Sequence, residues 1–164
     1  MNLTPSFNYC ITTEPHGALV NISIMKNPKY FELEELLRSE TALNHGIENL
    51  PAWEDVESLK ELVTDVLDPI RIEWGQPIIV NSGYRSVELN AKVGGVPNSA
   101  HMVGRAADVR LVSWSAKSIT DLFKLIQAMT ENGLIEVDKV ILYRKKKIVH
   151  ISNEYPRRKQ FIVK

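Results

Sequence analysis

The chain has 164 residues, a length that suits a single globular domain with its own hydrophobic core. Hydrophobic residues make up 44% of it and charged residues 24%, so neither a disordered nor a fibrous protein fits this composition. The formal net charge is zero, which argues against nucleic acid as the main partner.

Compartment and membrane signals are sparse. Cys10 is the single cysteine, so the chain cannot form an intrachain disulfide. No apolar stretch approaches the roughly 20 residues needed to cross a bilayer, and we expect no membrane partner. The first residues lack a basic region followed by an apolar core, so we expect a protein made in the cytoplasm without a signal peptide. No heptad pattern predicts an oligomeric state.

The N-terminal part predicts an extension followed by helices. Residues 1–27 form the extension, with one strand from 18 to 25 whose alternate residues are apolar. The main domain is expected to span residues 28–164. A short helix is predicted over 31–38, and the segment 46–51 is predicted to break the helical pattern after it.

A longer helix is predicted from about Glu54 to Glu73, because apolar residues recur there at helical spacing. Pro69 lies inside this pattern and should kink or tighten the last turn. Gly75 should end the helix.

The second half of the chain alternates short strands with helices. The last two predicted strands form a hairpin around a basic turn. Short antiparallel strands with helices on two sides indicate an α+β fold with a small antiparallel sheet and flanking helices. We predict strands at 77–81, 106–111, 139–143 and 148–151, and helices at 87–93 and 118–132.

Seven positive charges gather near the C-terminus, in residues 144–147 and 157–159. One interpretation is a solvated turn and a solvated tail. The other is an attraction to an anionic polymer such as cell wall or a phosphate backbone.

The segment Ser99-Ala-His101-Met-Val-Gly104-Arg-Ala-Ala107-Asp108 is the most informative in the chain. It places a histidine and a carboxylate one tight turn apart, and both are good zinc ligands. His150 lies between two apolar residues of a predicted strand, so its side chain should point away from their face. These three residues would complete a three-ligand zinc site with one position left for water.

This segment resembles the Ser-x-His-x-x-Gly-x-Ala-x-Asp pattern of the zinc D-Ala-D-Ala carboxypeptidases and dipeptidases, a peptidase M15-like family that shares its fold with hedgehog signalling domains. The segments Val80-Asn-Ser-Gly-Tyr-Arg-Ser86, Leu89-Asn90 and Val93-Gly-Gly-Val-Pro-Asn-Ser99 resemble the subfamily that includes many bacteriophage peptidoglycan peptidases. The resemblance covers roughly residues 28 to 160.

The resemblance implies roles for individual residues. His101, Asp108 and His150 are the metal ligands, and the metal is zinc. Arg85 is the arginine that binds substrate and stabilises the oxyanion, for which its planar fork is suited. Ser99 would lie beside the site and bind the substrate or hold a ligand, or it is simply a turn residue.

The family also uses a glutamate a few residues before the last histidine as general base. Residues 139–149 contain no Asp or Glu, and Tyr143 stands at the expected position. A tyrosine with a pKa near 10 is a poor base at neutral pH, although it can donate a hydrogen bond to an oxyanion. Asp138 matches a family aspartate that has a structural place, and Glu136 and Glu154 are the nearest other carboxylates.

The sequence therefore predicts a zinc peptidase that cleaves peptidoglycan stem peptides, as a D-Ala-D-Ala carboxypeptidase or an endolysin, at the cell wall or in a virion. Tyr143 leaves three explanations: another carboxylate has taken over, the enzyme works slowly, or the site binds without cleaving. The alternative function is an inactive zinc-fold module with a cell-wall-binding or virion structural role.

Overall fold

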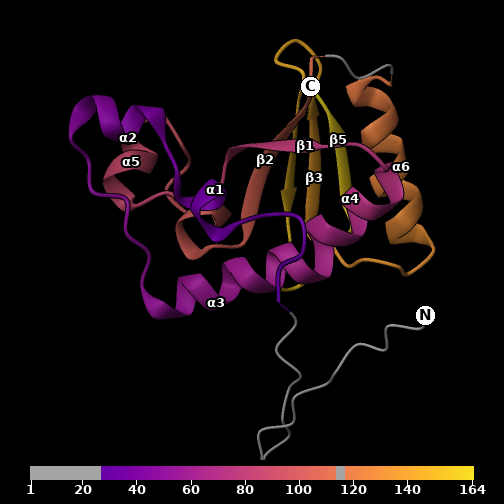
Figure 1. Ribbon diagram of the computed structural model, residues 1–164, viewed down its shortest axis with the longest axis horizontal. Coiled ribbons are helices and arrows are strands. Elements are labelled where there is room, and N and C mark those ends of the chain that lie inside the picture. The colour runs from indigo at the N-terminus through magenta and orange to yellow at the C-terminus, as the bar shows by residue number, and fades with distance from the viewer. Residues whose placement is uncertain (1–26, 114–116) are drawn as a thin grey trace, which may run out of the picture.

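The computed structural model describes residues 27–113 and 117–164. The extension over residues 1–27, including the strand predicted at 18–25, falls almost wholly outside them. The described chain is an α+β fold, as predicted: a five-stranded sheet with helices on both sides (Figure 1). The strands are β1 (Ile78–Ser82), β2 (Ala106–Leu111), β3 (Lys139–Tyr143), β4 (Ile148–Ser152) and β5 (Gln160–Val163).

The sheet has the order β1-β2-β4-β3-β5. The first four strands pair antiparallel, which confirms the predicted hairpin of β3 and β4. β5 was not predicted, and it pairs parallel with β3 at the edge of the sheet. It has four residues, too few for an alternating pattern to stand out from the basic segment before it.

Helices near the N-terminus differ from the prediction. The helix predicted over 31–38 is α1 (Leu33–Leu37), but a second helix, α2 (Glu40–His45), follows it and was not predicted. The break comes at Ser39, whose backbone is extended and whose hydroxyl accepts the N–H of Ala42 at 3.2 Å. Ser39 is therefore an N-cap that starts a new helix, which the sequence analysis missed.

The long helix is continuous but not uniform. It consists of α3 (Trp53–Leu62), a π-helical turn η1 (Val63–Leu67) and α4 (Asp68–Trp74), which ends at Gly75. Asp68 donates its N–H to the carbonyl of Val63, five residues back. The helix thus widens ahead of Pro69, so the predicted tightening of this turn is wrong.

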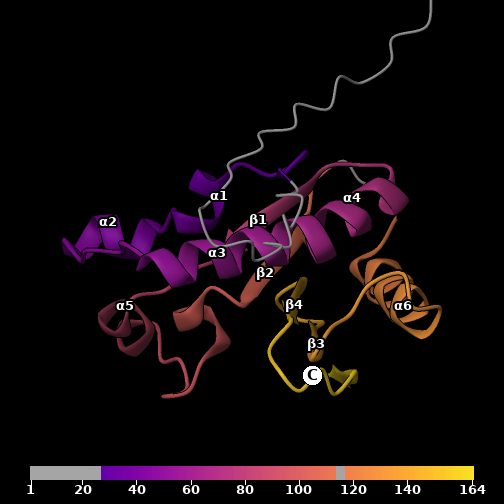
Figure 2. The ribbon, with the colours of Figure 1, turned by 90° about the horizontal axis from the view of Figure 1, so that it is seen from below.

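The main core lies between the sheet and the helices α3, α4 and α6 (Ile119–Glu131). α6 begins with a capping box of Ser118 and Asp121 and contacts β3 and β4. Figure 2 shows α6 on one side of the sheet and α5 (Val87–Lys92) on the other. Among the described helices, none is long and apolar enough to cross a membrane.

The two faces of the sheet have different surroundings. Val149 and Ile151 of β4 are buried in the core beneath α6. His150 lies between them, so its side chain emerges on the opposite face, as predicted. Asp108 is paired with His150 across the two strands and shares that face.

Candidate metal centre

Three predicted ligands meet on the face of the sheet away from α6. Asp108 comes from β2 and His150 from β4, where the two residues are register partners. His101 comes from η2 (Ala100–Val103), a 3-10 turn that the sequence analysis treated as loop. One potential ligand atom from each residue lies within 4.8 Å of the other two.

Asp108 is the hub of this cluster. Its Oδ1 lies 2.8 Å from His150 Nδ1 and 3.5 Å from His101 Nε2. The two imidazole rings are 5.1 Å apart between centroids. Burial alone would raise the pKa of Asp108, but the neighbouring His101 and His150 side chains outweigh it and hold the pKa well below its usual range.

His101 is oriented by the backbone. Its Nδ1 lies 2.6 Å from the carbonyl oxygen of Gly83, and a carbonyl can only accept, so Nδ1 carries the proton. Nε2 then keeps its lone pair, yet this buried atom has no hydrogen-bond partner. A buried imidazole nitrogen held in this way toward a carboxylate fits a divalent metal, because a ligating histidine usually donates its other nitrogen to a carbonyl or carboxylate.

Two glycines make this arrangement possible. A Cβ on Gly83 would overlap the backbone carbonyl of Leu36, whose oxygen also accepts the N–H of Tyr84 at 2.7 Å. Gly104 ends η2 with a φ of +67°, and a Cβ there would overlap the carbonyl oxygen of Asp55. Close backbone packing therefore sets the position of the turn that carries His101.

Arg85 is joined to the same carboxylate. Its Nη2 lies 2.7 Å from Asp108 Oδ2, and its Nε donates to Ser82 Oγ at 2.9 Å. The side chains of Arg85 and Asp108 are 15% and 17% exposed, so this ion pair is largely buried and is not a surface salt bridge. Arg85 thus holds one oxygen of Asp108 while the other faces the histidines.

Ser99 and Tyr143 are placed by their neighbours in the chain and in the sheet, and not by a contact with the three ligands that the described residues show. Ser99 immediately precedes η2, where its carbonyl accepts the N–H of Met102 at 2.9 Å. Tyr143 is paired with Ile148 at the end of β3, whereas Ile141 is the residue opposite His150. Tyr143 therefore shares the ligand face but lies two residues farther along β3 than Ile141. Lys146 Nζ lies 5.6 Å from the centroid of its ring. Their roles stay predictions.

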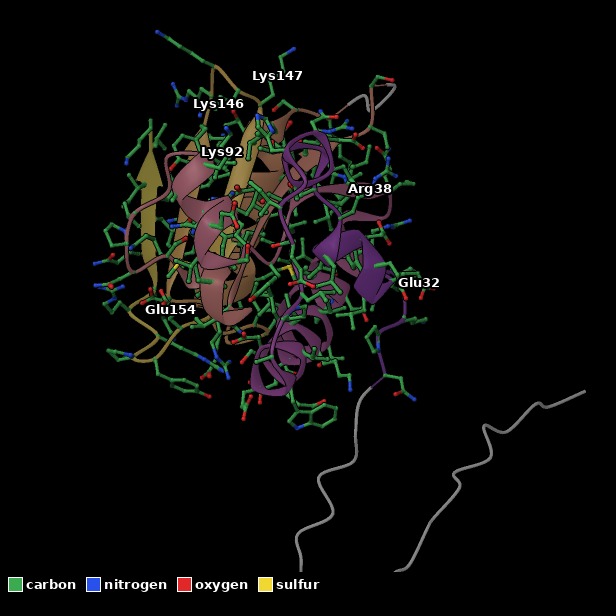
Figure 3. The ribbon with its side chains drawn as sticks, turned by 90° about the vertical axis from the view of Figure 1, so that its left-hand side faces the viewer. Glu32, Arg38, Lys92, Lys146, Lys147 and Glu154 are labelled. Carbon is green, nitrogen blue, oxygen red and sulfur yellow. The ribbon has the colours of Figure 1, made fainter. Side chains whose placement is uncertain are left out.

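A cavity of about 740 Å³ opens beside Arg85 and Asp108. Its walls come from α1, α2 and the junction between them, from α5, from β1, β2 and β4, and from the β3–β4 turn. Figure 3 shows Arg38 on the helical side and Lys146 on that turn. Four charged residues that line the cavity were not predicted from the sequence: Glu35, Arg38, Glu40 and Arg110. Lys146 belongs to the basic segment 144–147, which was predicted either to be solvated or to attract an anionic polymer. The position of Arg110, two residues after Asp108 on one strand, was the available signal.

The two basic segments have different surroundings. Arg158 binds Asp138, whose side chain is fully buried, through both its Nε and Nη2, at 2.6 and 2.7 Å. Arg157 pairs with Glu136. The second basic segment is thus tied to the fold rather than being a solvated tail. Glu136 is engaged in that pair and, like Glu154, is not among the residues that line the cavity.

Comparison with known proteins adds to this geometry. A family model described as Peptidase M15 matches residues 29–152. The chain is also similar to a zinc D-Ala-D-Ala carboxypeptidase of Streptomyces albus G, with 59% identity over 62 residues. That alignment covers 38% of this chain and 22% of the relative, so the chain matches about a fifth of the relative's length.

Proposed function

Because the chain belongs to the peptidase M15 family, we propose that it is a zinc peptidase that hydrolyses a peptide bond in the stem peptides of peptidoglycan. The observation that carries the proposal is the meeting of His101, Asp108 and His150, with ligand atoms within 4.8 Å and a buried His101 Nε2 that has no hydrogen-bond partner. The name of the Streptomyces relative supports both the metal and the substrate class.

His101 Nε2, an oxygen of Asp108 and a ring nitrogen of His150 would hold the zinc. Zinc bound there would supply a Lewis acid and lower the pKa of a water molecule. The protein keeps the ligands ready: Gly83 fixes the His101 tautomer, and Arg85 holds the second oxygen of Asp108.

Arg85 is also the residue that we propose to meet the substrate. It lines the cavity next to Asp108, and its guanidinium can donate bonds beyond those to Asp108 and Ser82. Such a group can bind a peptide carboxylate or neutralise charge that develops on the carbonyl oxygen under attack. Ser99, just before the His101 turn, would add a hydrogen bond.

We expect general-base catalysis to be the weak step of this enzyme. Tyr143 replaces the family glutamate, and loss of general-base assistance costs about 10²–10⁴-fold in rate. Glu35 and Glu40 line the cavity and are candidates for a substitute carboxylate. Glu40 is paired with Arg38 at 2.7 Å, and Glu35 accepts the N–H of Glu32 at 2.9 Å, so either carboxylate would have to leave a partner to act as the base.

A second function rests on the same tyrosine. Without a carboxylate between residues 139 and 149, the chain could bind zinc and wall peptide without cleaving, as a cell-wall-binding or virion structural module. A phage or prophage origin, with action at the cell wall or in a virion, fits the subfamily resemblance.

Digestion of purified peptidoglycan separates the two functions. Zinc-loaded protein should release new amino or carboxyl termini, which are counted by chemical labelling and mass spectrometry. His101→Ala is the control that removes a ligand. A preparation with one zinc per chain that releases no termini would exclude the peptidase and leave the binding module.

A further inference from the structure

The cavity extends along the sheet beyond the metal ligands. Arg110 follows Asp108 by two residues on β2, and Ile148 precedes His150 by two residues on β4, so both lie on the ligand face. Two residues along a strand correspond to about 6.6 Å. Arg110 and Ile148 both line the cavity, and Lys146 of the following turn lines it too. A second row of side chains therefore lies next to the ligand row.

This second row is positively charged and is not neutralised by the protein. Arg110 is exposed, and within residues 27–113 and 117–164 neither Arg110 nor Lys146 forms an ion pair with a carboxylate. Lys146 Nζ instead lies over the ring of Tyr143, 5.6 Å from its centroid. Asp108, the acidic residue that lines the cavity on the sheet side, is paired with Arg85. The other two acidic residues belong to the helical wall, where Glu40 is paired with Arg38 and Glu35 accepts the N–H of Glu32 in a capping box.

We propose that Arg110 and Lys146 form a second, carboxylate-binding subsite that selects stem peptides whose diamino acid carries an extra carboxylate. This inference rests on the proposed function. Arg85 would bind the substrate group that reacts at the metal. The second row lies at a distance from Arg85 that one or two residues of an extended peptide would span. A side-chain carboxylate on a residue one or two positions from the scissile bond can reach it.

Peptidoglycan chemistry offers a matched pair of ligands for this subsite. The third residue of the stem peptide is either diaminopimelate, which ends in an amine and a carboxylate, or lysine, which has the amine alone. Arg110 and Lys146 would bind the extra carboxylate with charge-assisted hydrogen bonds. The chain should therefore prefer the diaminopimelate peptide by roughly tenfold, the effect of one such bond at a partly exposed site.

The test measures binding and cleavage separately. Fluorescein-labelled L-Ala-D-Glu tripeptides that end in diaminopimelate or in lysine are titrated by anisotropy, and the corresponding peptides with D-Ala-D-Ala added are assayed for cleavage. The variants are Arg110→Gln and Lys146→Gln. Lys145→Gln is the control, because Lys145 is in the same turn and carries the same charge but does not line the cavity. All four proteins are compared by thermal unfolding to confirm an unchanged fold.

We expect the unmodified protein and Lys145→Gln to bind the diaminopimelate tripeptide about tenfold more tightly than the lysine tripeptide, and the other two variants to lose most of this difference. Equal binding of both tripeptides by the unmodified protein would overturn the subsite, as would an equal loss in Lys145→Gln, which would indicate a general attraction to the basic turn. Discrimination without cleavage would overturn the peptidase and leave the subsite standing. Cleavage of both longer peptides at equal rates would overturn the subsite and leave the peptidase standing.

Discussion

His150 and Asp108 are register partners on neighbouring antiparallel strands, with His150 Nδ1 2.8 Å from Asp108 Oδ1. The same carboxylate accepts from Arg85 through its other oxygen and faces His101. One aspartate therefore links the ligands to the arginine beside the cavity. A substitution that removes a hydrogen bond to this carboxylate or to one of the histidines should therefore lower the affinity for zinc.

Gly83→Ala should weaken zinc binding about 10–100-fold, because the added Cβ would force the Gly83 carbonyl away from His101 Nδ1. Equilibrium competition with a chromophoric chelator measures this. Gly133→Ala is the matched control: it has a φ of +71° and open space around its Cβ, so it strains the backbone without touching the site. Equal affinities for the two variants would contradict the role of the carbonyl.

Arg85→Ala should also lower zinc affinity, by roughly tenfold, because Asp108 loses the donor that orients its Oδ2. Arg110→Ala removes an equal charge from the same cavity and should leave zinc affinity unchanged. If Arg85→Ala binds zinc normally and loses cleavage alone, Arg85 acts on the substrate and does not position Asp108.

Tyr143→Glu should raise the rate of peptide cleavage, by about 10²-fold where the missing base limits the reaction. Tyr143→Phe keeps the ring and removes the hydroxyl, so it should change the rate little. Initial rates on a D-Ala-D-Ala peptide test both. A large loss in Tyr143→Phe would instead show that the phenol takes part in the reaction.

Asp138→Asn should destabilise the protein at neutral pH and have a diminishing effect in acid. Hydrogen bonds from Arg158 lower the pKa of Asp138, although burial opposes them. A carboxyl whose pKa is lower in the folded than in the unfolded chain, where it is about 3.9, stabilises the fold above that pH and loses this effect as the pH falls through the folded value. Urea unfolding of metal-free protein at pH 7, 5, 4 and 3 should show the gap to the unmodified chain closing below pH 4. Glu48→Gln, at an exposed site, should show no such gap.

Local patterns predicted most strands, and together with the resemblance to the zinc D-Ala-D-Ala peptidases they predicted the three ligands. Asp108 and His150 lie on predicted strands, so the directions of their side chains follow from the period of a strand. His101 lies on a turn, and the carbonyl of Gly83 orients its ring. β2 and β3 begin and end where predicted. The start of α2 was not predicted, because a serine such as Ser39 can lie inside a helix or cap its start. The hydrogen bond from the N–H of Ala42 to its hydroxyl shows that it is a cap.

The cavity could not be predicted, because its walls come from segments distant in the chain. Glu35 of α1 and Lys146 of the β3–β4 turn line one space only after the sheet has brought β1, β2 and β4 together. The strand register also depends on the assembled sheet: it puts Ile141 opposite His150 and Tyr143 opposite Ile148, on the same face, and the place of Tyr143 at the base position stays a prediction. Register depends on tertiary pairing that no local pattern contains.

The central claim is that His101, Asp108 and His150 together hold one zinc ion. Competition titration against a chromophoric chelator, with metal content checked by atomic emission, tests it most directly. The unmodified chain should bind one zinc per chain, and His101→Ala, Asp108→Ala and His150→Ala should each lose most of the affinity. A chain that binds no zinc, or one that keeps its affinity after any of these substitutions, would contradict the account.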